Sequence, residues 1–145
     1  MEVGYGGWDT HNENFDRIPE KVPVLDKALT ALLQDLEARG LLKKTLVVLT
    51  SEFGRSPKIN DRVGRDHHPA AFTSLLAGAG VKRGYVHGKS DERAHGVDED
   101  PVSVQDFTAT IATVVGIDTK KEVFSATRRP FKVADEGEAV KALLT

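Results

Sequence analysis

Carboxylate and imidazole side chains recur in three stretches of the sequence. Asp9 and His11 are two residues apart, directly after a glycine pair; Glu52 follows an apolar run; and His67 and His68 are adjacent. Side chains at i and i+2 of an extended backbone lie on the same side, so Asp9 and His11 can face one ligand. Carboxylate oxygen and imidazole nitrogen suit a hard or borderline divalent cation. We therefore expect the three stretches to meet at one metal site.

The expected ligands are Asp9, His11, Glu52 and one of the histidine pair, either His67 or His68. Two histidines and a carboxylate leave a coordination position free for water or substrate. A bound zinc, calcium or manganese ion would polarise an ester oxygen or acidify a water molecule. Each group also has a plainer interpretation: a tied-down loop for the first pair, a helix cap or an arginine partner for the glutamate, and a solvated turn for the histidines. Their joint occurrence favours the metal site.

Two arginines flank the expected ligands. Arg55 follows Glu52, and Arg65 precedes the histidine pair. A guanidinium group matches the oxygens of phosphate or sulfate, so these residues are candidates for binding an anionic ester of a small molecule or a glycan. The alternative is that they form surface ion pairs with Glu52 and Asp66.

Composition excludes several other functions. The chain has 145 residues, enough for one domain with a core of its own, and a formal net charge of −2. This charge gives no electrostatic basis for a nucleic-acid or anionic-membrane partner. The absence of cysteine excludes disulfides, thiolate zinc sites and cysteine nucleophiles. No apolar run reaches the roughly 18 residues of a membrane span.

Three segments have helical character. Leucines recur at helical spacing over 21–39, where Gly40 supplies a C-cap and Pro19 and Pro23 limit the start. Residues 102–115 carry a second apolar stripe, which begins at Ser103 and Asp106 in the manner of a capping box. Residues 135–144 are expected to form a short terminal helix.

Three apolar runs have strand character, namely 1–7, 46–50 and 70–77. The run at 46–50 is apolar throughout, which is typical of a strand buried on both faces of a parallel sheet. Strand, helix and strand over 1–50 form one βαβ unit. The predicted fold is therefore a three-layer α/β structure with a mostly parallel sheet flanked by helices. In such sheets ligands bind beyond the carboxyl ends of the strands, where Asp9, His11 and Glu52 fall.

The motifs, taken in order, resemble the C-terminal half of a bacterial family of unknown function in the alkaline phosphatase/sulfatase-like superfamily. The matching stretches cover nearly the whole chain; the main ones are Gly-Gly-Trp-Asp-Thr-His at 6–11, Thr-Ser-Glu-Phe-Gly-Arg-Ser-Pro at 50–57, Gly-Arg-Asp-His-His-Pro at 64–69, Leu-Ala-Gly-Ala-Gly at 76–80 and Arg-Pro at 129–130. The resemblance implies a partial alkaline-phosphatase-like fold. It also implies export to the periplasm or outside the cell, since members often carry twin-arginine signals.

The resemblance assigns the expected ligands more closely. Asp9, His11 and His67 resemble the three ligands of one metal, with His68 as the alternative to His67. Glu52 stands where the first ligand of a second metal occurs, next to Phe53, which cannot bind one. The superfamily nucleophile belongs to an N-terminal strand without a counterpart here. Residues 1–145 would then form a single domain that is the C-terminal portion of a larger one.

Three functional hypotheses follow from the sequence. The first is a metal-dependent hydrolase of sulfuric or phosphoric esters whose nucleophile segment is absent from this chain. The second is a binding or assembly module that keeps the fold without hydrolysis. The third is self-association through unpaired strand edges, because an open edge invites a further strand.

Overall fold

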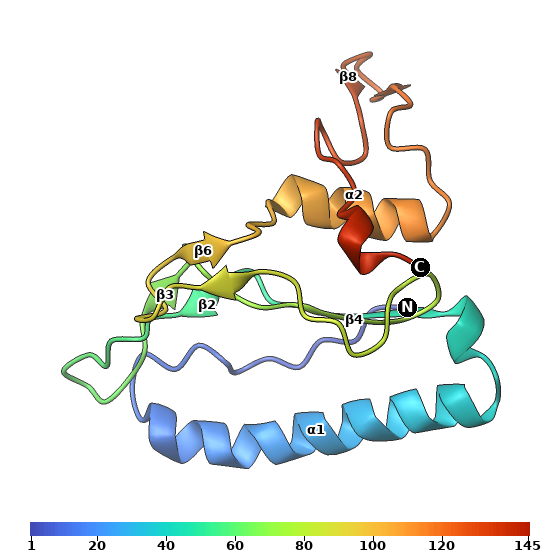
Figure 1. Cartoon of the computed structure of the whole chain (residues 1–145). Helices are drawn as coiled ribbons and strands as arrows, with labels where there is room; N and C mark the ends of the chain where they lie inside the picture. Colours follow the sequence, from blue (N-terminus) through green and yellow to red (C-terminus); the bar gives the residue numbers. More distant parts are fainter.

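Two helices and four short strand pairs make up the computed structural model, which describes residues 1–145 (Figure 1). The helices are α1 (Asn14–Ala38) and α2 (Val104–Val114), with 3-10 turns η1 (Leu42–Lys44) and η2 (Lys141–Leu143). The antiparallel pairs are β1 (Leu46–Leu49) with β4 (Leu75–Gly78), β2 (Gly54–Arg55) with β3 (His67–His68), β5 (Lys89–Ser90) with β6 (Val97–Glu99), and β7 (Val123–Phe124) with β8 (Pro130–Phe131).

The predicted helix at 21–39 is present, but its start is wrong. α1 begins at Asn14 and contains both Pro19 and Pro23. Each proline costs a backbone hydrogen bond of the helix, yet neither one ends it. The C-terminal end is as predicted: Gly40 has φ 68°, its N–H bonds to Glu37 O, and the next N–H bonds to Leu36 O, which is a Schellman ending.

The second helix is confirmed. α2 begins after Ser103, whose hydroxyl accepts a hydrogen bond from Asp106 N at 3.0 Å and donates to the Asp106 carboxylate at 2.7 Å. The third predicted helix, at 135–144, is wrong, since only the three-residue turn η2 forms there. Glu138 N and Val140 N instead donate to side chains of α2, so this tail lies against the helix.

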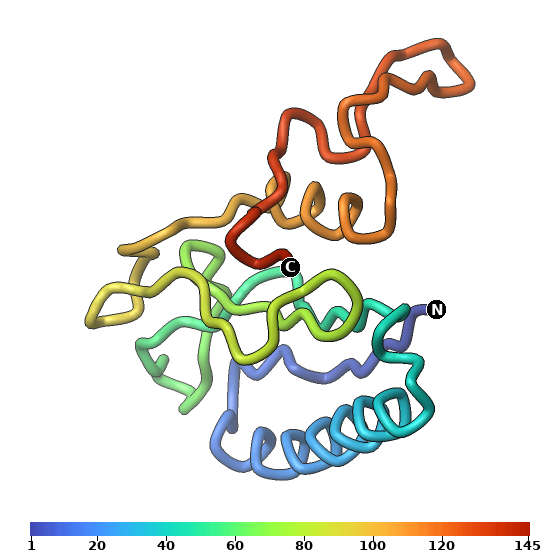
Figure 2. The backbone as a smooth tube through the Cα atoms, turned by 45° about the vertical axis from the view of Figure 1, so that its right-hand side comes forward, coloured from blue at the N-terminus to red at the C-terminus, as the bar shows by residue number.

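The predicted three-layer fold with a mostly parallel sheet is wrong. β1 pairs only with β4, and the pairing is antiparallel. Residues 1–7 form no strand: three of the seven are glycines, all are exposed, and none of their backbone groups bonds to a strand. Without that strand there is no βαβ unit, although the segment does run between α1 and the strands in both views (Figures 1 and 2).

The core is thin for a chain of this length. Only eight of the 145 residues are buried, and the apolar ones among them are Val81, Ala109, Ala112 and Ala134. The hairpin of β7 and β8 projects away from the rest of the chain in both views (Figure 2). None of the helices has the length and apolar character needed to cross a membrane.

Candidate metal centre

The hairpin of β2 and β3 brings two predicted site residues face to face. Arg55 pairs with His67, and Gly54 pairs with His68. Neighbouring residues of a strand point to opposite faces of the sheet, so His67 and His68 point in opposite directions. Phe53 lies on the His67 side, with its ring centroid 4.4 Å from that of the imidazole. The hairpin therefore presents Arg55 and His67 together and turns His68 away.

The loop that carries Asp9 and His11 is fastened to this hairpin and to the start of α1. Thr10, which is fully buried, donates its hydroxyl hydrogen to Asn14 Oδ1 at 2.6 Å. Its carbonyl accepts a hydrogen bond from Arg65 N at 2.9 Å. Gly64 packs directly on the backbone of His11: a Cβ at this glycine would lie 2.1 Å from the His11 carbonyl. Segments more than 50 residues apart are thereby held together.

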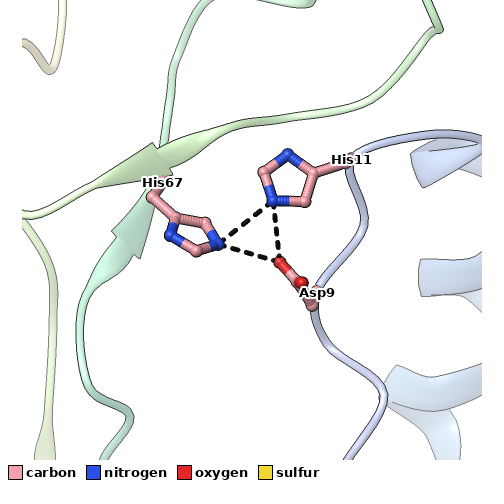
Figure 3. Close-up of side chains that lie close together, drawn as sticks. All are labelled: Asp9, His11 and His67. Atoms are coloured by element: carbon pink, nitrogen blue, oxygen red, sulfur yellow. Dashed lines mark hydrogen bonds and ion pairs between the residues drawn. The ribbon is translucent and has the colours of Figure 1, made fainter.

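Three ligand atoms converge in front of these segments (Figure 3). The Nε2 atoms of His11 and His67 are 3.1 Å apart, and Asp9 Oδ1 lies 3.1 Å from the first and 3.0 Å from the second. The side chains are 37 % exposed for His11, 47 % for His67 and 63 % for Asp9, so solvent reaches the group. We call Asp9, His11 and His67 the triad.

A second layer of polar groups orients His11. Its Nδ1 lies 2.7 Å from Asp66 Oδ1, which also accepts from Asn60 Nδ2 at 2.9 Å. Asn60 Nδ2 donates to the His11 carbonyl as well, and its Oδ1 accepts from the backbone N–H of Gly64. An ionised carboxylate is only an acceptor, so His11 carries its proton on Nδ1. The lone pair of Nε2 then faces the other two members of the triad.

Asp9 lies among positively charged and hydrogen-bonding nitrogens. Arg55 Nη2 donates to Asp9 Oδ1 at 2.7 Å, the same oxygen that faces both imidazoles. The hydrogen bond from His67, followed by that from Arg55, lowers the pKa of Asp9 to about 2. The hydrogen bond from His11 likewise lowers the pKa of Asp66. Both carboxylates are therefore ionised over the whole neutral range.

Replacing Arg55 with glutamine should raise the pKa of Asp9 from about 2 toward its ordinary value of 3.8. A depressed pKa favours the folded state above the unfolded-state pKa, and this contribution is lost as the pH falls through the folded-state value. The contribution of Asp9 to the free energy of unfolding is therefore lost between about pH 4 and pH 2. Carboxyl-carbon NMR of Asp9 during an acid titration measures the shift. Arg39→Gln, which removes an ion pair with Asp35 on α1, is the control and should leave the Asp9 titration unchanged.

The other predicted site residues lie outside the triad. Glu52 is exposed in the loop after β1, and it is not part of the group of converging ligand atoms. His68 Nε2 lies 3.0 Å from the carbonyl of His95. Arg65 directs its guanidinium to the carbonyls of Ser56 and Pro57, at 2.6 and 2.9 Å, so it fastens its own loop.

Two residues of the second layer were not predicted as part of the site. Asp66 was considered only as a partner for an arginine, and Asn60 was not among the site residues. The adjacency of Asp66 to the histidine pair was a usable signal, because metal-bound histidines usually donate their other N–H to a carboxylate or carbonyl. The sequence offers Asn60 only as a lesser candidate for binding an anion; in the structure its side chain bonds the His11 carbonyl, the Asp66 carboxylate and the backbone N–H groups of Arg62 and Gly64.

Comparison with protein families gives a match over nearly the whole chain. A family model described as "Protein of unknown function (DUF1501)" matches residues 1–144. Neither a curated protein nor a solved structure matches the chain.

Proposed function

The chain belongs to the DUF1501 family of proteins of unknown function, and from this premise we propose that it binds a divalent metal ion for the hydrolysis of phosphoric or sulfuric esters. The observation that carries the proposal is the convergence of Asp9 Oδ1, His11 Nε2 and His67 Nε2 within 3.1 Å of one another. The motif resemblance to the alkaline phosphatase/sulfatase-like superfamily supports the same chemistry.

The dimensions of the triad fit a metal ion. Ligands at zinc bond lengths of 2.0–2.1 Å are about 3.3 Å apart in a tetrahedral site. The three separations in the triad, 3.0 to 3.1 Å, are close to this value. One oxygen and two nitrogens also form a donor set that zinc and manganese accept. Asp9, His11 and His67 would therefore hold the ion on one side and leave the solvent side for a further ligand.

The residues around the triad would assist metal and substrate binding in different ways. A bound divalent ion would act as a Lewis acid toward an ester oxygen. Phe53 packs against the His67 ring, and Asp66 fixes the tautomer of His11. Arg55, next to Asp9, is the candidate for binding a substrate anion, because a guanidinium group can hold two oxygens of a phosphate or sulfate. Arg65 is the weaker candidate: its guanidinium bonds two carbonyls of its own loop, whereas that of Arg55, which also donates to the Arg65 carbonyl at 3.2 Å, contacts a member of the triad.

A second candidate function is metal-dependent binding without hydrolysis. The nearest hydroxyl in the sequence to the triad, that of Thr10, is buried and donates to Asn14, so it is not presented as a nucleophile. A hollow of about 730 Å³ lies between α1 and β4 and is lined by none of the triad residues. A binding module requires neither a nucleophile nor a substrate pocket at the metal.

Calorimetric titration with zinc, manganese and calcium tests the proposal. We expect one ion of at least one of these metals to bind per chain at neutral pH. If none of the three binds, the proposal is wrong. Hydrolysis of aryl phosphate and aryl sulfate esters by the metal-loaded whole gene product separates the two candidates: turnover supports the hydrolase, and tight metal binding without turnover supports the binding module.

Asp66→Asn should lower the metal affinity by about 10- to 100-fold, the usual loss when a histidine ligand loses its outer partner. The substitution keeps the shape of the side chain but removes the charge that holds the His11 proton on Nδ1. Nitrogen-15 NMR of the His11 ring should show a mixture of tautomers in the variant. Asp61→Asn, at an exposed position nearby, is the control. Unchanged metal affinity and tautomer in Asp66→Asn would contradict this role.

A further inference from the structure

The chain exposes much more surface than its mass predicts. Its accessible area is 10796 Å², whereas a folded monomer of 15.8 kDa exposes about 7,300 Å². The excess is roughly 3,500 Å². Obligate dimers bury about 2,000–5,000 Å² in total, half of it on each protomer. A second polypeptide therefore has ample surface to cover.

The open edge of β1 is a specific place for such a contact. Thr45 O accepts a hydrogen bond from the residue after β4, at 3.1 Å. Bonded and non-bonded pairs alternate along an antiparallel ladder, so Val47 and Leu49 direct their N–H and C=O groups toward β4. Leu46 and Val48 direct theirs away from β4, which is the only strand that pairs with β1, and none of the backbone hydrogen bonds outside the helices and strands uses them. β1 thus presents ordered, unpaired donors and acceptors on its outer edge.

We propose that β1 pairs antiparallel with β1 of a second copy of this chain, about a two-fold axis at Val47. Leu46 of each copy exchanges both backbone hydrogen bonds with Val48 of the other. The two Val47 side chains then meet across the axis as a non-bonded pair, the closer of the two kinds of pair. The β1–β4 pairs of the two copies then join into one four-stranded sheet in the order β4, β1, β1, β4. This sheet provides hydrogen-bond partners for the outer backbone groups of both β1 strands.

The sequence around β1 favours a copy of itself as the partner. An axis at Val47 sets Leu46, Val47 and Val48 of one copy against Val48, Val47 and Leu46 of the other, so apolar side chains meet apolar side chains; all of them are half-buried. Lys43 and Lys44 precede the strand and Glu52 follows it. Antiparallel pairing brings the basic end of one strand toward the acidic end of the other, whereas parallel pairing would set like charges together. A net charge of −2 per chain adds little repulsion between copies. This proposal does not depend on the metal site.

Amide hydrogen exchange and light scattering test the pairing on the whole chain. We expect a dimer mass, and slow exchange of the Leu46 and Val48 amides although neither has an acceptor within its own chain. Dilution over about a hundredfold range should lower the melting temperature, as in any coupled association. A monomer mass, a mass above two copies, or exchange of these amides as fast as that of the exposed Val86 would overturn the proposal.

Val48→Pro provides the matching variant. It removes an N–H that makes no bond within the chain and sets the ring on the outer edge, so the ladder to β4 keeps its bonds. We expect Val48→Pro to be monomeric, and Val3→Pro, in the exposed N-terminal segment, to remain dimeric. A dimeric Val48→Pro variant would overturn the proposal. If that variant does not fold, the exchange of the Leu46 and Val48 amides in the unmodified chain decides.

Discussion

Replacing His11 with alanine is expected to abolish tight zinc binding, with a loss of affinity greater than about 100-fold. The loss exceeds that for an outer-layer residue, because His11 supplies one of only three converging ligand atoms. The substitution also leaves Asp66 without its closest partner, at 2.7 Å. Calorimetric titration of the variant with zinc measures the effect directly.

His68→Ala is the matched control for this experiment. It removes the other histidine of this hairpin, which faces away from the triad and has its Nε2 3.0 Å from the His95 carbonyl. Its zinc affinity should equal that of the unmodified chain. If His68→Ala loses zinc and His11→Ala retains it, the ligand assignment is wrong.

Gly64→Ala should disturb both the fold and the site. The added methyl group would lie 2.1 Å from the carbonyl carbon and oxygen of His11 and 2.5 Å from Asn12 N, all backbone atoms. Overpacking of this kind costs about 1–3 kcal/mol, and sometimes more. Since His11 must move to relieve the contact, zinc affinity should fall together with the free energy of unfolding. Urea denaturation and zinc titration measure the two effects.

Gly4→Ala controls for the loss of glycine itself. A Cβ at Gly4 would have no neighbour within 4 Å, so stability and zinc affinity should both be unchanged. If Gly64→Ala were as stable as Gly4→Ala, the close packing of Gly64 on the His11 backbone would be contradicted.

Local signals predicted two of the three expected helices correctly and the sheet wrongly. Leucine spacing and Gly40 located the end of α1, and Ser103 located the start of α2, because caps and periodicity are properties of a few neighbouring residues. The apolar run at 46–50 correctly indicated a strand, which the structure has at Leu46–Leu49. It did not indicate the partner or its direction, since both depend on which distant segment packs beside it. The antiparallel choice of β4 could not be derived from the run itself.

In the candidate site, too, local features were predictable from the sequence and long-range contacts were not. The i, i+2 spacing of Asp9 and His11 placed both candidate ligands on one side, and the structure brings both together with His67. The choice between His67 and His68 depended on the pairing of Arg55 with His67, a long-range contact. Asn60 and Gly64 act through backbone atoms 49 and 53 positions away in the sequence, so no local pattern could reveal them.

The two-residue ladder of β2 and β3 also restricts how the loop between its strands can change in length. Slippage of the ladder by one position would put His68 opposite Arg55 and exchange the faces of the two histidines. Slippage by two would restore the alternation but move both imidazoles along the strand. An insertion or deletion at 56–66 that shifts this register by an odd number of positions would therefore turn His67 away from Arg55. Relatives of this chain should vary in length there only where the pairing of Arg55 with His67 is preserved.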